Sequence, residues 1–214
     1  MEKSFDISRY VREGWELLMS HFANLIVATL IFLGIQFAIG SLVPVFGGMI
    51  VSGPLMGGLF YVILDLRRGK EFQITRMFDG FTKKLVPLVL VGALTSVFIT
   101  AGFFLLILPG LLISGWYLFP YLFVVDKDMD FWPAMEASRE IGFNNHVHVF
   151  LFVVVLIVIN LLGALAVGIG LLISVPLSMC SVAIAYESLT GAKTEAVEKT
   201  PPPLAPPPSP TIPS

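Results

Sequence analysis

Charged side chains are scarce in this chain of 214 residues. Asp, Glu, Lys and Arg make up 13% of it and hydrophobic residues 56%, whereas a soluble domain carries about 25% charged residues. So little charge cannot cover a water-soluble globule, which excludes a soluble globular enzyme. Disorder over most of the length is excluded too, because disordered chains are poor in apolar residues. The composition therefore predicts an integral membrane protein.

Basic charge and cysteine are lacking as well. The net charge is −2 and no basic stripe runs along the chain, so we expect no nucleic-acid partner. The single cysteine, Cys180, excludes an intramolecular disulfide, and its apolar surroundings favour a packing role. Residues 1–21 mix acids and bases before a long apolar run, so we expect no cleaved signal peptide.

Three blocks of the chain contain no Asp, Glu, Lys or Arg: Leu17–Leu64, Leu85–Val125 and Ile141–Tyr186. A membrane span needs about 20 apolar residues, so each block is about two spans long. Gly or Pro near the middle of each block predicts a turn, and unpaired backbone groups in hydrocarbon require helices. The predicted spans are 22–43, 48–66, 85–107, 110–126, 147–167 and 170–189, which form hairpins at about 22–66, 85–126 and 147–189.

The distribution of positive charge predicts the orientation. With six spans, all 13 Lys and Arg fall on the side of the two termini. Positively charged loops stay cytoplasmic. We therefore expect a multi-pass protein of the cell (cytoplasmic) membrane, with both the N- and C-termini in the cytoplasm.

An acidic residue closes each predicted hairpin on that cytoplasmic side: Asp65, Asp126 and Glu187. In one interpretation these acids form a ring of pairs with neighbouring basic side chains. The basic residues considered are Arg67, Arg68 and Lys127. In the other interpretation the acids only mark the ends of the spans, and the sequence alone favours this second one.

The three hairpins share a short motif, in which a Gly is followed four residues later by a Ser. It occurs at Gly48–Ser52, Gly110–Ser114 and Gly170–Ser174, at steps of 62 and 60 residues. Fixed spacing favours repeated units, which would be related by an axis along the membrane normal. Chance is the alternative, because apolar composition raises the number of matches.

A candidate amphipathic helix precedes each hairpin, at about 7–22, 74–85 and 130–141. Asp6 is the expected N-cap of the first helix, and Pro133 lies in the first turn of the third. Such helices either lie in the headgroup plane or pack on the cytoplasmic face of the bundle. The complete prediction is an all-α integral membrane domain at 1–190, with six transmembrane helices in three hairpins, each preceded by a cytoplasmic amphipathic helix.

The end of the chain, 191–214, is predicted to be a disordered, Pro-rich cytoplasmic tail. Residues 201–206 contain the PxxP spacing that SH3 and WW grooves bind. A protein partner for this tail is one interpretation. A stiff, solvated end without a partner is the other, and it is favoured because composition alone identifies no ligand.

The predicted membrane interior contains no ionisable side chain apart from Cys180. This argues against ion-driven transport, which uses charged groups inside the spans. Asn160 is the most conspicuous polar residue there, and helix packing is favoured over a substrate contact for it. A facilitator of neutral solutes is not excluded.

Two motifs resemble metal sites without completing one. His146 and His148 are two residues apart and do not share a helix face. The acids of 126–130 mimic the start of an EF-hand loop, but Phe131 and Ala137 stand where the loop needs Gly and Glu. We therefore predict no catalytic, cofactor-binding or metal-binding residue, and no cofactor.

The segment Leu105–Trp116, with Pro120 next and Ala134 and Ser138 downstream, carries a family resemblance over about residues 5–190. It resembles uncharacterised prokaryotic six-helix membrane proteins related to the membrane domain of glycerophosphodiester phosphodiesterases. The resemblance implies a helical membrane domain without an assigned activity. The phosphodiesterase itself is a separate soluble barrel, for which this chain has neither the length nor the motifs.

Two functions therefore stay open. The first is a non-enzymatic membrane protein that is scaffolding, regulatory or lipid-associated, with membrane lipids as its partners. The alternative is a transporter or channel for small neutral or amphiphilic molecules. The sequence leaves the oligomeric state unknown.

Overall fold

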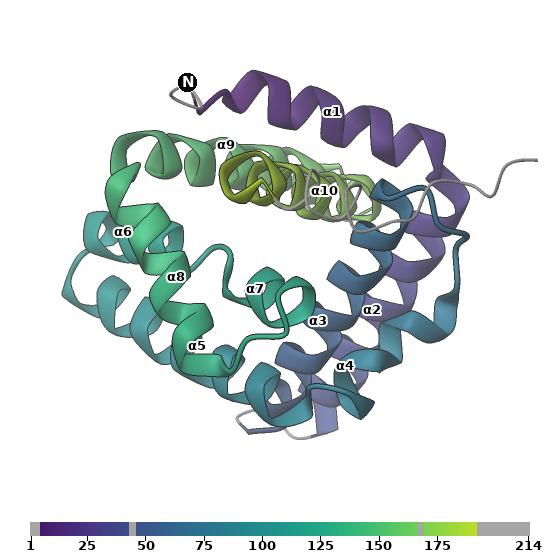
Figure 1. Cartoon of the computed structure of the whole chain (residues 1–214), viewed down its shortest axis with the longest axis horizontal. Helices are drawn as coiled ribbons and strands as arrows, with labels where there is room; N and C mark the ends of the chain where they lie inside the picture. Colours follow the sequence, from purple (N-terminus) through teal and green to yellow (C-terminus); the bar gives the residue numbers. More distant parts are fainter. Residues whose placement is uncertain (1–4, 43–45, 167–168, 192–214) are drawn as a thin grey trace, which may run out of the picture.

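The structure, a computed structural model, describes residues 5–42, 46–166 and 169–191. Within these ranges every regular element is a helix (Figure 1). The elements are α1 Ile7–Ser20, α2 Phe22–Leu42, α3 Phe46–Arg67, the 3-10 helix η1 Ile74–Phe78, α4 Asp79–Thr82, α5 Leu85–Leu105, α6 Ile107–Trp116, α7 Pro120–Asp126, α8 Phe131–Asn144, α9 His146–Leu165 and α10 Leu171–Thr190. Nearly all of the Pro-rich tail lies outside the described residues, so its disorder and its partner stay predictions.

Five stretches of the described residues are long and apolar enough to cross a membrane. They are Phe22–Ile39, Leu85–Leu105, Ile107–Asp126, His146–Leu165 and Leu171–Thr190. The all-helical class and the apolar character of the helices are thus confirmed. The helix α3 coincides with another predicted span but is not among the five stretches, so the sixth span stays a prediction.

The second predicted hairpin differs from the expected one in two places. The chain turns at Leu106, in extended conformation, and not at Pro109 and Gly110. Pro109 instead lies in the first turn of α6, where its missing amide proton breaks no helical hydrogen bond. The predicted span 110–126 lies within the apolar stretch Ile107–Asp126, but it is not one continuous helix: the helix is interrupted after Trp116 and resumes as α7 with Pro120 in its first turn.

The three expected amphipathic helices have different outcomes. Asp6 caps α1 as predicted, accepting a hydrogen bond from the amide of Arg9, and α1 packs against α10 with Gly14 next to Ser181. Packing on the bundle is therefore what the structure shows for this helix. The second expected helix is wrong, because 74–85 folds as η1 followed by the single turn α4. The third is α8, with Pro133 in its first turn.

The connection between α3 and α5 lies directly on α3. A side chain at Gly58 would overlap the backbone of Met77 in η1, and one at Gly80 in α4 would overlap the backbone of Pro54. Only glycine lets two backbones come this close. The glycines of α3 and α4 therefore dock the connection onto the bundle.

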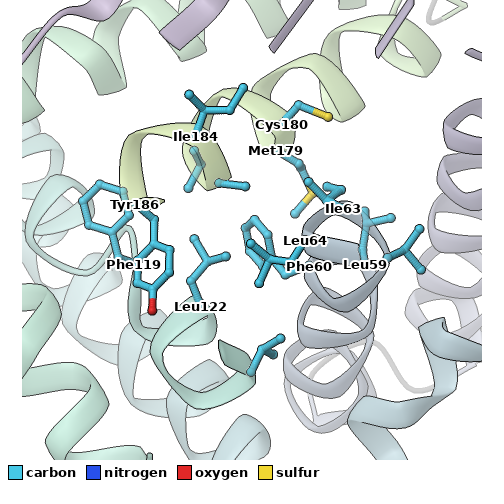
Figure 2. Packing of buried hydrophobic residues seen from close by; sticks show 14 of the residues in the cluster. Leu59, Phe60, Ile63, Leu64, Phe119, Leu122, Met179, Cys180, Ile184 and Tyr186 are labelled. Atoms are coloured by element: carbon cyan, nitrogen blue, oxygen red, sulfur yellow. The ribbon is translucent and has the colours of Figure 1, made fainter. Parts of the chain in front are cut away.

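The core lies where α3, α7 and α10 meet. Phe60 and Leu64 of α3 point toward Leu122 of α7, and Ile63 of α3 lies next to Met179 of α10 (Figure 2). The short helix α7 lies in the middle of the molecule, in contact with α3 on one side and with α5 and α8 on the other (Figure 1). The interrupted stretch Ile107–Asp126 thus places the short, buried helix α7 at the centre of the fold.

The outside of the described helices is strongly apolar. Phe37 of α2 is 80% exposed and Phe104 of α5 is 91% exposed, and many Leu, Val and Ile side chains of α5 and α9 are exposed with them. Monomeric soluble proteins do not expose contiguous apolar surface of this kind. This surface is compatible with contact to lipid.

Candidate functional site

Ion pairs at one end of the bundle join helices that are distant in sequence. Arg67, at the end of α3, lies between two acids: its Nη2 is 2.7 Å from Oε2 of Glu13 in α1, and its Nε is 3.1 Å from Oε2 of Glu187 in α10. The Glu187 side chain is only 3% exposed. A single guanidinium thus links α1, α3 and α10.

The next residue makes a second link. Arg68 donates a hydrogen bond to Asp126 at the end of α7, and its Nε lies 4.0 Å from Oε1 of Glu187. The hydroxyl of Tyr186 donates to the other oxygen of Asp126 at 3.0 Å. Because Asp126 ends the central helix α7, this contact fixes the end of α7 against α3 and α10.

The third acid, Asp65, holds the connection that follows α3. Its carboxylate accepts hydrogen bonds from Arg76 at 2.6 Å and from Lys70 at 2.7 Å. Arg76 also pairs with Asp79. The hydrogen bond from Arg76 to Asp65 raises the pKa of this guanidinium above its ordinary value, so Arg76 stays charged.

We call these residues the charged end. Its members are Glu13, Asp65, Arg67, Arg68, Arg76, Asp126 and Glu187. The three hairpin-closing acids are thus paired, as in the ring interpretation that the sequence did not favour. Arg67 and Arg68 pair with Glu187 and Asp126, but the Arg partner of Asp65 is Arg76.

The charged end is a network of ion pairs that holds helices together. Within the described ranges, no group of three or more His, Cys, Asp or Glu is placed to hold a metal ion. The two His that the sequence singled out are exposed: His146 has Nδ1 3.1 Å from the carbonyl of Phe143, and the ring of His148 lies beside Phe5. Cys180 is buried in the core.

A second polar cluster lies between α9 and α10, far from the charged end along both helices. The amide nitrogen of Asn160 donates to the hydroxyl of Ser178 at 2.7 Å and to the carbonyl of Leu156 at 2.8 Å. The Asn160 oxygen accepts from the hydroxyl of Ser174 at 3.2 Å. These bonds join α9 to α10, as polar side chains between membrane helices do.

This cluster borders a groove of about 450 Å³ between α6, α9 and α10. We call it the polar groove. Its lining includes the polar residues Ser114, Asn160 and Ser178 and the apolar residues Leu118, Leu156 and Leu161. Ser114 and Ser174 are the serines of the repeated Gly-Ser motif, and both lie close to Asn160 or to the groove that it lines.

Ser138 of α8 supports the break between α6 and α7. Its buried hydroxyl donates to the carbonyl of Trp116 at 2.8 Å and accepts from the amide of Phe119 at 3.1 Å. These are backbone groups at the place where the helix is interrupted, so Ser138 replaces helical hydrogen bonds. Sequence reasoning named Ser138 only as part of a family motif, and gave it no role.

We expect Ser138→Ala to lower the free energy of unfolding by about 1–3 kcal/mol, because the buried amide of Phe119 and the partly buried carbonyl of Trp116 lose their partner. Thermal unfolding in detergent micelles, followed by circular dichroism, measures this change. Ser96→Ala is the matched control, since Ser96 is exposed on α5 and surface changes stay within about 0.5 kcal/mol. Equal midpoints for the two variants would contradict the bridging role.

Comparisons with known proteins do not assign this chain to a family. Protein-family models, curated proteins and solved structures each give no match to the chain. The class is therefore what the structure itself defines, an all-helical protein with apolar helices compatible with a membrane. The resemblance to phosphodiesterase-linked membrane domains stays a prediction.

Proposed function

We propose that this chain is a non-enzymatic, lipid-associated protein of the cytoplasmic membrane that serves as a scaffold or regulator. It crosses the membrane six times in three hairpins, with α3 as the additional span and both termini in the cytoplasm. The observation that carries the proposal is that the apolar surface and the charged residues lie on different parts of the molecule. Long helices expose apolar side chains such as Phe37 and Phe104, whereas the paired charges gather at the ends of α3, α7 and α10.

The position of the charged end supports the orientation. The helices α3, α7 and α10 all end there, at Arg67, Asp126 and Thr190. The chain reverses at the other end, near Leu106 and between α9 and α10. Since Lys and Arg favour the cytoplasmic side, the charged end faces the cytoplasm in this proposal.

The ion pairs of the charged end favour a scaffolding function over an enzymatic one. Arg67, Arg68 and Arg76 are each committed to carboxylates that hold helices together. A nucleophile and a base within hydrogen-bond reach, aimed at a pocket, would be the signature of an enzyme. The charged end instead gives a rigid cytoplasmic face on which other membrane components could assemble.

Cysteine labelling tests the topology. In a Cys180→Ala background, we expect Leu106→Cys and Ala166→Cys to react with a membrane-impermeant maleimide added to intact cells, because both positions are exposed at the turns. Lys70→Cys and Lys83→Cys should react only after the cells are permeabilised. Gel shift with a maleimide-linked polymer reads out each reaction.

Reaction of Lys70→Cys in intact cells, at the rate of Leu106→Cys, would overturn the orientation. Reaction at only one of the two turns, with the other inaccessible, would overturn the arrangement as three hairpins. The buried Cys180 of the unmodified chain serves as the unreactive control.

Facilitated passage of small neutral molecules is the second candidate function. The observation in its favour is the polar groove, where uncharged hydrogen-bonding groups lie among apolar side chains within the spans. Uptake of glycerol and similar neutral solutes into vesicles containing the chain tests it. Uptake at the rate of protein-free vesicles across a broad panel would leave the scaffold as the function.

A further inference from the structure

The polar groove lies toward the end of the bundle opposite the charged end. Asn160 is five residues before the end of α9 at Leu165, and Ser178 is seven residues after the start of α10 at Leu171. A rise of about 1.5 Å per residue puts both about 8–10 Å from that end. In the proposed orientation, this depth is the upper acyl region of the outer leaflet.

The groove presents hydrogen-bonding capacity that no other group in the described part of the chain uses. Both amide protons of Asn160 are donated, but within the described residues its oxygen accepts only the bond from Ser174. Ser178 accepts from Asn160, and its own proton reaches no acceptor in the described part of the chain. Ser114 donates to the carbonyl of Gly110, which leaves its lone pairs open. The groove thus offers one donor and several acceptors.

The charge of the lining decides which ligand fits. Its polar members are two hydroxyls and one amide, and none of the described residues that line it is ionisable. A phosphate or an ammonium group placed there would be desolvated without a partner of opposite charge, which is costly in an apolar environment. The ligand's polar part must therefore be uncharged.

Shape and exposure indicate how the ligand enters. Ile157 and Leu161 line the groove and are exposed on the outer surface of α9, whereas Leu156 forms its buried side. The groove is therefore open from the side, toward the surrounding acyl chains, and an acyl chain can lie along it. A ligand that carries its own chains suits this opening better than a small solute.

We propose that the polar groove binds diacylglycerol, a neutral glycerolipid with one hydroxyl and two ester carbonyls. The Ser178 hydroxyl donates to an ester carbonyl, and the lipid hydroxyl donates to the Asn160 oxygen or to Ser114. The acyl chain packs along Ile157 and Leu161. This assignment names the lipid of the proposed lipid-associated function and rests on the membrane placement given there.

Photolabelling of the full chain in phosphatidylcholine vesicles tests the assignment. The probe is a diacylglycerol with a diazirine near the top of one acyl chain, and the reference is a phosphatidylcholine with the same modified chain. We expect the diacylglycerol to label peptides of α9 and α10 about fivefold more than the reference, which is the selectivity of about one hydrogen bond, because the reference carries the same two ester carbonyls but no free hydroxyl. Peptides of α5 should show no such preference.

Two variants separate site binding from general contact with lipid. Ile157→Trp fills the groove from an exposed position and should abolish the preference. Val97→Trp, at an exposed position of α5, is the matched control and should keep it. Leu161→Trp repeats the test at a second lining position, and an unchanged thermal midpoint shows that each variant is folded.

The outcomes distinguish this inference from the proposed function. A chain that enters the vesicles but labels equally with both probes, or labels as before in Ile157→Trp, overturns the diacylglycerol site alone. A chain that does not enter the vesicles overturns the membrane placement itself. Strong labelling by phosphatidylcholine in the groove would contradict the requirement for an uncharged headgroup.

Discussion

Replacing Arg67 with methionine is expected to lower the free energy of unfolding by about 3–5 kcal/mol, the range for breaking a buried ion pair from one side. Arg67 pairs with Glu13 and Glu187, and the latter carboxylate is almost completely buried. Methionine keeps much of the volume but leaves this carboxylate without its hydrogen-bonded cation. Thermal and denaturant unfolding in detergent micelles measure the loss.

The matched control is Arg12→Met on α1. Arg12 pairs with Glu16 at 4.0 Å, and its side chain is 72% exposed, so its removal should change stability by less than about 1 kcal/mol. The double variant Arg67→Met with Glu187→Gln should recover part of the loss, because an uncharged amide needs no cation. Similar losses of stability in Arg67→Met and Arg12→Met would show that the ion pairs of the charged end do not hold the helices together.

Replacing Gly58 with alanine is expected to have the second largest effect. The new methyl group would occupy the position of the Met77 carbonyl oxygen in η1, and neither backbone can withdraw without moving a helix. Overpacking of this kind costs about 1–3 kcal/mol or more. The substitution should also loosen the connection between α3 and α5 locally. We therefore expect faster proteolysis of this connection in addition to a lower thermal midpoint.

Gly34→Ala in α2 is the control for this substitution. Gly34 has no atom within 4 Å of the added methyl group, and alanine has the higher helix propensity. We therefore expect unchanged or slightly raised stability for Gly34→Ala. Tolerance of Gly58→Ala at the same level would contradict the close docking of η1 on α3.

Helix positions could be predicted from the sequence, because they depend on local patterns. Charge-free runs of about 40 to 50 residues with Gly or Pro near the middle located α2, α3, α5, α9 and α10 to within two residues at each end. The break before α7 was missed because a Pro in an apolar run predicts a kink as readily as a new start. The helix is interrupted there because Ser138, 19 residues after Phe119, accepts a hydrogen bond from the Phe119 amide. This contact is not visible in the local sequence.

The sites could be predicted only in part. The sequence identified Asp65, Asp126 and Glu187 as equivalent positions, and it identified Asn160 as the polar residue to examine. It could not identify Glu13 as the partner of Arg67, because the two are 54 residues apart and only the packing of α1 on α10 brings them together. Nor could it show the groove, whose walls come from three different helices.

Extraction of membranes with alkaline carbonate tests most directly whether lipid solvates this chain. We expect the chain to stay in the membrane pellet after a wash that removes a peripheral protein, and only detergent to release it. A chain that enters the wash and remains monodisperse without detergent would contradict the account.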